Sequence, residues 1–92
     1  MVIKKTASAG SATKNDCLVT VSPLDGDGIE VDLESIVKIQ FGDQLIAAAK
    51  GMAQEMGVTS VRISIVDKGS LDYVVRARTE AALRRAEGGA EQ

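Results

Sequence analysis

The side chains best suited to accept a chemical group lie in residues 9–16, which read AGSATKND. This short polar stretch carries two hydroxyls, on Ser11 and Thr13, and the primary amine of Lys14. A hydroxyl becomes a strong nucleophile when a base is held beside it, and histidine is the usual base. The chain has no histidine. The segment therefore offers reactive groups without the proton shuttle that an enzyme of this kind needs.

Other residue types that support catalysis or metal binding are equally sparse. One cysteine, Cys17, and no histidine exclude a zinc site built from these ligands. The acidic residues Glu30, Asp32 and Glu34 share one side of a strand pattern, but no further ligand is spaced to complete a cation shell. The stretch GDGIE precedes a strand rather than a helix, and DKGSLD lacks the glycine pattern of a phosphate-binding loop. We therefore expect a module that binds, carries or scaffolds, not a stand-alone enzyme.

Length and composition narrow the class further. The 92 residues make one domain, and the net charge of −2 gives no footprint for nucleic acid. The only aromatic residues are Phe41 and Tyr73, which are too few to predict recognition by stacking on bases. No run approaches the roughly 20 apolar residues that span a bilayer, and the N-terminus lacks the apolar core of a signal peptide. The single cysteine excludes an internal disulfide and fits a reducing cytoplasm, with Cys17 as a small buried hydrophobe.

Alternation of apolar and polar residues predicts three clear strands and a weaker one. Cys17 to Ser22 and Ile29 to Glu34 each place apolar side chains on one face. The turn residues between these two runs favour an antiparallel hairpin. Val58 to Val66 is the third strand. Residues 3–8 form a possible edge strand, and residues 10–16 are a loop by composition.

Apolar positions spaced three and four residues apart predict a helix after the second clear strand. Ser35 can cap this helix, Ile36 begins it and Gly57 is a natural stop. Its buried stripe runs from Phe41 to Met56.

The segment after the turn at residues 67–69 has two interpretations. Its length and alanine content favour a helix capped by Ser70, with Asp72 in the first turn and arginines near the end. The alternative is a return strand over residues 70–76 followed by a shorter helix. The apolar face of the full helix would consist of Leu71, Val74, Val75, Ala81 and Ala82.

The predicted element order is β-β-β-α-β-α, in a single domain over residues 1–92. This order indicates an α+β fold in which an antiparallel three- to four-stranded sheet packs against two helices on one face. Residues 1–16 are expected to be a flexible segment that contains the reactive loop, and residues 87–92 a frayed tail.

Four strings in a fixed order carry a family resemblance. They are MVIKKTASAGS at the N-terminus, SPLD at residues 22–25, SIVKIQFGDQL at 35–45 and VDKGSLDYVVRARTEAALRRA at 66–86. Their most specific pieces are QFG, DKGSLD and RAR, and the spacing is kept without gaps from about Val2 to Ala86. Each string alone is unspecific. The ordered set resembles the citrate lyase acyl carrier protein family, the γ chain of that enzyme.

This resemblance implies a carrier rather than a catalyst. In the family, a prosthetic-group transferase attaches 2'-(5''-phosphoribosyl)-3'-dephospho-CoA to a serine hydroxyl, and the thiol of this arm bears an acetyl group. An α chain exchanges acetyl for citrate, and a β chain cleaves the citryl carrier to oxaloacetate. The implied partners are these two chains and the transferase, without nucleic acid or membrane. A mobile tether suits this role because it raises the local concentration of the cargo at each partner site.

The sequence departs from the family at the attachment position. Counting from Ala9 and Gly10, Lys14 stands where the family has its modified serine, and lysine cannot form that phosphodiester. Three explanations are open: the site has been altered to block modification, the chain is a natural paralogue that has lost the arm, or Ser11 or Thr13 serves instead. Ser11 aligns with an unmodified threonine of the family. Thr13 is a secondary alcohol and a poorer acceptor.

Lys68, Arg76 and Arg78 are the candidate partner-binding residues. The resemblance favours contacts with partner chains or with the anionic arm, whose phosphates suit guanidinium groups. The alternative for the two arginines is a solvated helix face that complements the helix dipole. Two other functions are open beside the carrier: a non-carrying structural or regulatory subunit on the same scaffold, and an unrelated small interaction module.

Overall fold

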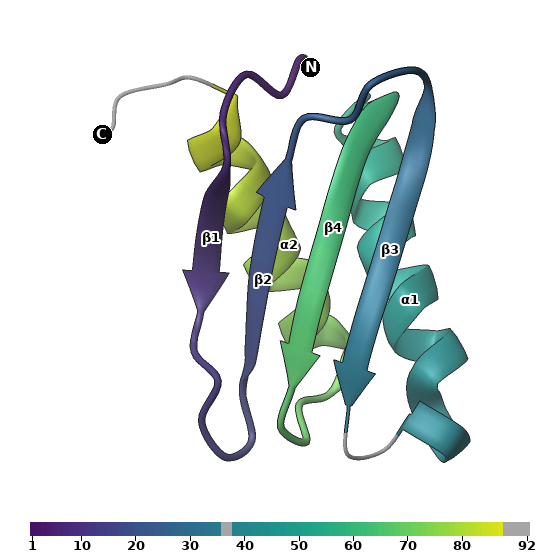
Figure 1. Cartoon of the computed structure of the whole chain (residues 1–92). Helices are drawn as coiled ribbons and strands as arrows, with labels where there is room; N and C mark the ends of the chain where they lie inside the picture. The colour runs from purple at the N-terminus through teal and green to yellow at the C-terminus, as the bar shows by residue number, and fades with distance from the viewer. Residues whose placement is uncertain (36–37, 88–92) are drawn as a thin grey trace.

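A computed structural model of the chain describes residues 1–35 and 38–87 (Figure 1). Four strands form one sheet in the order β1-β2-β4-β3, and both helices cover the same face of it. The α+β class and the predicted order of elements are confirmed. The elements are β1 (Ala7–Gly10), β2 (Cys17–Ser22), β3 (Gly28–Ser35), α1 (Lys38–Glu55), β4 (Ser60–Asp67) and α2 (Asp72–Ala86).

The sheet is mixed rather than antiparallel. β2 pairs antiparallel with both β1 and β4, whereas β3 lies on the far side of β4 and pairs with it in parallel. The predicted hairpin between β2 and β3 is wrong because β4 occupies the place between them. A parallel pair needs a long crossover connection, and α1 supplies it between β3 and β4.

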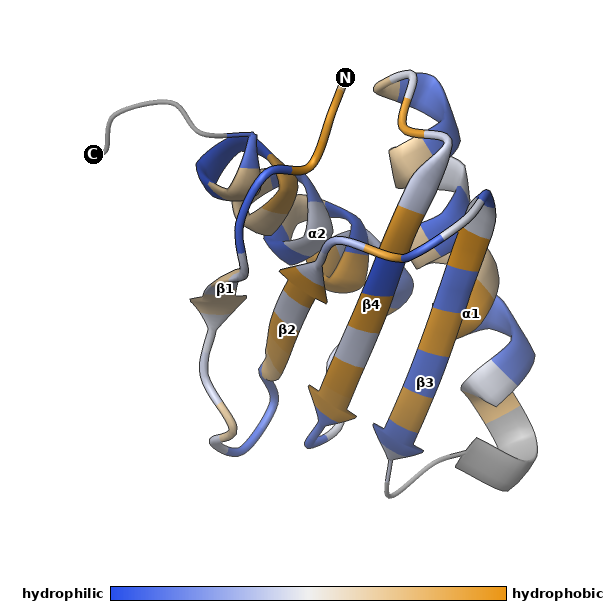
Figure 2. Cartoon of the chain, turned by 45° about the horizontal axis from the view of Figure 1, so that its top comes forward, coloured by the Kyte–Doolittle hydropathy of each residue, from blue (hydrophilic) through white to orange (hydrophobic). Residues whose placement is uncertain are grey.

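The position of β4 between two strands follows from its apolar inner side. Val61, Ile63 and Ile65 are at most 2% exposed, and alternating hydrophobic and hydrophilic bands run along β3 and β4 in Figure 2. The connection from β2 to β3 passes the start of β4. There the Ser60 hydroxyl lies within hydrogen-bond distance of two carbonyl oxygens, at 2.9 Å from Leu24 and 2.6 Å from Gly26. This contact fastens the connection across the end of the central strand.

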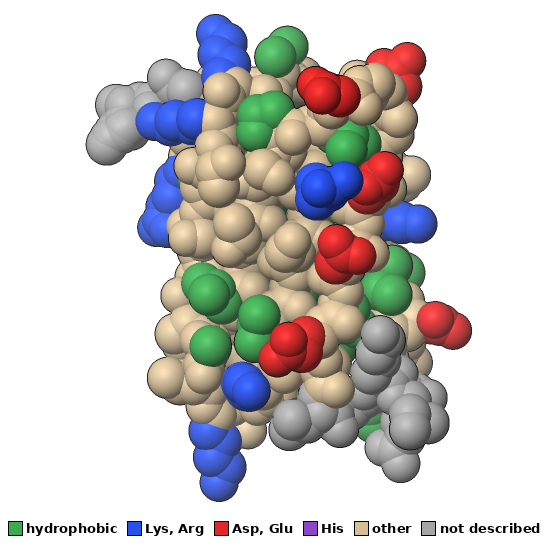
Figure 3. All heavy atoms as spheres, in the orientation of Figure 1, with side chains coloured by type: hydrophobic (Ala, Val, Ile, Leu, Met, Phe, Trp, Pro, Cys, Tyr) green, Lys and Arg blue, Asp and Glu red, His purple; other side chains and the backbone are tan. Residues whose placement is uncertain are grey.

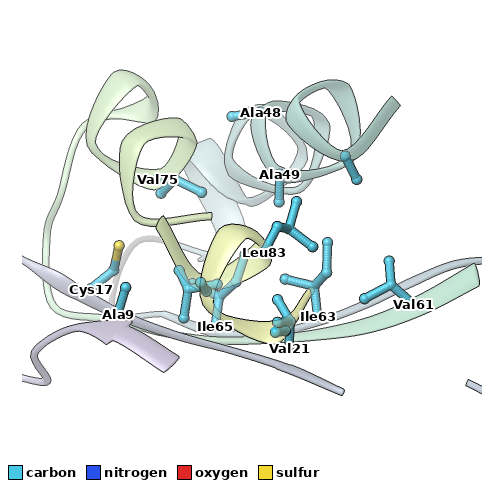
Figure 4. Close-up of a cluster of buried hydrophobic side chains, with 14 of the residues drawn as sticks. Ala9, Cys17, Val21, Ala48, Ala49, Val61, Ile63, Ile65, Val75 and Leu83 are labelled. Atoms are coloured by element: carbon cyan, nitrogen blue, oxygen red, sulfur yellow. The ribbon is translucent and has the colours of Figure 1, made fainter. Parts of the chain in front are cut away.

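The hydrophobic core fills the space between the sheet and the two helices (Figure 4). The inner side chains of β2, Cys17, Val19 and Val21, are fully buried, as predicted. α2 packs over β1 and β2, while α1 packs over β3 and against α2. Each fully buried valine, leucine or isoleucine contributes about 1.5–3 kcal/mol, so this layer supplies the main stabilisation of the fold.

The first helix departs from its predicted pattern at Phe41. Gly57 adopts a φ of +75°, which fits the predicted stop just beyond the helix end. Phe41, however, is 47% exposed, so its place on the buried stripe is wrong. It lines a solvent-open hollow of about 230 Å³ together with Leu71 and Leu45. The predicted helix start at Ile36 lies outside the described residues.

The segment after the turn is a helix from Asp72 onwards, so the interpretation with a return strand is wrong. Leu71 occupies the N-cap, is 59% exposed and makes no capping hydrogen bond with its side chain. In the first turn, the Tyr73 amide donates to the Asp72 carboxylate at 2.9 Å. The predicted cap by Ser70 is wrong because the Ser70 hydroxyl donates instead to Asp67. Apart from Glu87, the expected frayed tail lies outside the described residues. The buried face of α2 consists of Val75, Thr79, Ala82, Leu83 and Ala86.

The N-terminal segment contains the expected edge strand, which spans Ala7–Gly10 instead of residues 3–8. Before it, Ile3 is buried and the Met1 ammonium group donates to the Gly57 carbonyl at 3.1 Å. The mobility expected for residues 1–16 stays a prediction. Among the described residues, no helix has the length and apolar character to cross a membrane.

Candidate functional site

The loop that carries the reactive side chains, residues 11–16, joins β1 to β2 at one end of the sheet (Figure 1). We call it the β1–β2 loop. At its base the Ser11 amide donates to the Cys17 carbonyl at 3.1 Å. Gly10, just before it, has a φ of +91°, and an added Cβ would lie 2.0 Å from that same carbonyl oxygen. The two backbone segments approach so closely at the base of the loop that only glycine fits at this position.

The tip of the β1–β2 loop consists of Lys14 and Asn15. The Asp16 amide donates to the Thr13 carbonyl at 3.0 Å, which closes a four-residue turn around the tip. Asn15 has a φ of +68°, a left-handed conformation that asparagine tolerates better than most residues. Lys14 is exposed at the corner of this turn, and within the described part of the chain its ammonium group has no hydrogen bond or ion pair.

The two hydroxyls of the loop point to each other and to a carboxylate. Ser11 Oγ donates to Asp16 Oδ2 at 2.9 Å, and Thr13 Oγ1 lies 2.7 Å from Ser11 Oγ. An ionised carboxylate only accepts hydrogen bonds, so the Ser11 proton is directed at Asp16 and Thr13 must donate to Ser11. Both hydroxyl protons are therefore committed within the loop.

Asp16 anchors this chain of hydrogen bonds to α2. It accepts from the Cys17 amide at 2.7 Å and from Arg78, whose Nε and Nη2 lie 3.1 and 3.2 Å from its two oxygens. The backbone amide of Cys17, then Arg78 and the Ser11 hydroxyl, hold the pKa of Asp16 below its usual value and outweigh the effect of burial. Arg78 is thus committed to a half-buried ion pair inside the chain.

The turn between β4 and α2, residues 67–71, lies directly beside the loop; we call it the β4–α2 turn. The Asn15 amide donates to the Lys68 carbonyl at 2.8 Å, and the Lys68 amide donates back to the Asp16 carbonyl at 2.9 Å. This reciprocal pair joins two segments more than fifty residues apart in sequence. Lys68 is half-buried next to the loop.

A buried carboxylate, Asp67, organises the β4–α2 turn. It is 1% exposed and accepts hydrogen bonds from the Ser35 hydroxyl at 2.7 Å, from the Ser70 hydroxyl and amide, and from the Gly69 amide. Burial raises the pKa of Asp67, but the bonds from Ser70, Ser35 and the backbone outweigh it, so the pKa lies below its usual value. Asp67 thereby connects the ends of β3 and β4 to the start of α2.

The structure brings some of the predicted residues together and separates others. Ser11, Thr13, Lys14, Lys68 and Arg78 lie around one end of the sheet. Arg76 does not join them, because its Nη2 binds Glu55 of α1 at 2.9 Å. Sequence reasoning missed Asp16 and Asp67, which stand directly before β2 and at the end of β4; their places at strand ends were the available signal.

The acidic row on β3 and Cys17 lie apart from the β1–β2 loop tip or are buried. The acidic row on β3 is exposed on the uncovered face of the sheet, where Figure 3 shows acidic side chains, and Glu30 pairs with Arg62 at 3.0 Å. Within residues 1–35 and 38–87, no group of three or more cysteine, aspartate or glutamate side chains is placed to hold a metal ion. Cys17 is fully buried, and burial raises the pKa of its thiol, so it is not a reactive thiol.

Within residues 1–35 and 38–87, the arrangement is an exposed loop tip on a base that is hydrogen-bonded to β2 and α2. This geometry is typical of a small domain that presents a surface loop to other proteins.

Comparisons with known proteins agree with this class. The family model described as malonate decarboxylase delta subunit (MdcD) matches residues 4–86. Relatives named citrate lyase acyl carrier protein include one from Halothermothrix orenii, 46% identical over 100% of this chain and 97% of the relative. The relative from Streptococcus equi subsp. equi is 47% identical over 96% of this chain and 86% of the relative. The relative from Clostridium perfringens is 48% identical over 94% of this chain and 85% of the relative. The chain belongs to the family of acyl carrier proteins that this family model and these relatives define. It is a non-catalytic carrier subunit.

Proposed function

We propose that the chain is the acyl carrier subunit of a cytoplasmic citrate lyase complex. In this role it presents acetyl and citryl thioesters to an α chain that transfers the acyl group and to a β chain that cleaves the citryl group. The observation that carries the proposal is the β1–β2 loop, an exposed tip on a base that is bonded to both β2 and α2. The names of the relatives support the choice of complex.

The position of the β4–α2 turn supports docking at the same end of the molecule. Lys68 lies beside the loop tip because its backbone is paired with Asn15 and Asp16. A partner chain that binds this turn would hold the loop tip near the reaction centre of the partner. Arg76 offers a second contact on α2, in an exposed ion pair with Glu55 that a partner can replace at little cost.

The phosphoribosyl-dephospho-CoA arm of the resembling family does not fit the residues of this loop. Its phosphodiester needs a hydroxyl at the tip, where this chain has Lys14. The Ser11 hydroxyl is half-buried and bonded to Asp16, and the Thr13 hydroxyl is bonded to Ser11. A hydroxyl-linked arm therefore lacks a free attachment point here. The same observation favours a second candidate, a non-carrying structural or regulatory subunit that docks on the same partners.

The proposal is tested by affinity capture and intact-mass analysis. The tagged chain, expressed in its own host, should retain stoichiometric amounts of lyase α- and β-type chains identified by peptide sequencing. Co-expression with the prosthetic-group transferase should leave the mass of the chain unchanged, whereas a Lys14→Ser variant should gain the arm. Absence of both large chains from the captured material would refute membership of the complex. An arm mapped to Ser11 or Thr13 would refute the misfit of these hydroxyls.

A further inference from the structure

An acyl carrier needs a thiol, and this chain exposes none. Group carriers such as coenzyme A and lipoamide hold acyl groups as thioesters, which are reactive enough to be passed on. The only cysteine, Cys17, is fully buried in β2. An acyl group placed directly on Lys14 would form an amide, which is too stable to be transferred again. If the proposed carrier function holds, as this inference requires, the thiol must come from an attached cofactor.

The loop offers one free atom for such an attachment. The hydroxyl protons of Ser11 and Thr13 are committed to the chain of hydrogen bonds that ends at Asp16. Lys14 stands at the corner of the closed turn, exposed and without a described partner. Its amine can reach the active site of a modifying enzyme while the ion pair of Asp16 with Arg78 keeps the base of the loop in place.

We propose that Lys14 Nζ is the attachment atom for a thiol-bearing carboxylic acid, joined through an amide bond. The chemistry of the acceptor decides the class of cofactor. An amine forms a stable bond with a carboxyl group, whereas the phosphate linkage of a nucleotide arm requires a hydroxyl. Lys14 would thus replace one carrier linkage by another at the same place in the loop.

The attachment is balanced with ATP as the co-reactant. ATP first converts the cofactor carboxylate into an acyl adenylate and releases pyrophosphate. The lone pair of the neutral Lys14 amine then forms a C–N bond to the carbonyl carbon. The bond from that carbon to the phosphate oxygen breaks, and AMP leaves with the electron pair. The surplus proton on nitrogen passes to a base of the modifying enzyme or to water.

The test combines intact mass with thiol labelling of the native chain purified from its own host. We expect a mass above that of the sequence, with the adduct on Lys14 and resistant to hydroxylamine, which cleaves thioesters. After reduction, N-ethylmaleimide should label the folded chain rapidly. In a Lys14→Arg variant only Cys17 remains, and labelling should become roughly 100-fold slower or more because β2 must open first. Lys50→Arg, at an exposed position on α1, is the matched control and should label like the wild type.

Each other outcome has a definite meaning. A bare chain without a rapidly labelled thiol refutes the inference, and so does an adduct on Ser11 or Thr13. Either result can occur while the α- and β-type chains are still captured, so the inference can fail without the proposed complex failing. Loss of capture with an adduct still present on Lys14 would refute the proposed complex instead.

Discussion

Replacing Asp67 by alanine tests whether a buried carboxylate holds the site end of the molecule together. Asp67 is 1% exposed and accepts hydrogen bonds from four donor groups: the hydroxyls of Ser35 and Ser70 and the amides of Gly69 and Ser70. Asp67→Ala removes the acceptor and leaves these donors without it in a region that water reaches poorly. The variant should therefore be strongly destabilised.

The magnitude follows from the number and type of these bonds. A hydrogen bond to a charged group contributes about 1.5–3 kcal/mol, but bonds that share one carboxylate are not additive. Removing one partner from a buried charged network typically costs about 3–5 kcal/mol. This is a large part of the roughly 5–14 kcal/mol expected for a domain of this size.

Urea unfolding followed by circular dichroism measures the effect. With a denaturant slope of about 1–1.5 kcal/mol per molar urea, the midpoint should fall by about 3 M in Asp67→Ala. Asp43→Ala removes an exposed carboxylate from α1 and is the matched control, with an expected change below about 0.5 kcal/mol. If both variants unfold within 0.5 M of the wild type, with unchanged slopes, the clamp described for Asp67 does not stabilise the fold.

Three further predictions concern the loop and α2. Arg78→Ala should lower the free energy of unfolding by about 1 kcal/mol and speed amide hydrogen exchange in the β1–β2 loop, since Asp16 loses a half-buried partner; unchanged exchange would argue against anchoring. The pKa of Asp16 is lower in the folded chain than in the unfolded chain, so the Asp16 carboxylate stabilises the fold fully above about pH 4. As the pH falls, the unfolded chain takes up the proton at a higher pH than the folded chain does. The stabilisation therefore disappears as the pH falls through the pKa of Asp16 in the folded chain. A thermal melt series from pH 6 to pH 2 should show this loss, with a smaller slope in Asp16→Asn. Arg76→Glu should change stability by less than about 1 kcal/mol, because the pair with Glu55 is exposed, yet weaken capture of the partner chains; intact capture would remove Arg76 from the docking surface.

The positions of the strands and helices were predictable because each depends on a local pattern. The alternation in Cys17–Ser22 and Ser60–Asp67 follows from one side chain pointing into the core and the next away from it. Pairing is not local. The same alternation is compatible with several neighbours. The parallel pair depends on the crossover through α1, which follows β3 and precedes β4 in the chain.

The site was predictable in one respect and hidden in another. Family resemblance located the position of Lys14, which the fold places at an exposed loop tip. The hydrogen-bond networks centred on Asp16 and Asp67 were not predicted, because a carboxylate beside a turn is usually interpreted as a solvated turn residue. Their partners, Arg78 and Ser35, lie 62 and 32 residues away in sequence, and no short-range pattern connects them.

The unexpected parallel pairing explains why the β1–β2 loop and the β4–α2 turn were predicted separately and not as neighbours. In an antiparallel sheet with β2 next to β3, β4 would run in the opposite direction, and Asp67 would lie at the far end of the sheet. A strand of eight residues is about 26 Å long, so the β4–α2 turn would be that far from the β1–β2 loop. Because β4 instead runs antiparallel to β2, its last residue lies opposite Cys17, and Lys68 meets Asn15. The direction of one strand therefore decides whether the loop tip and the proposed docking turn face the same partner.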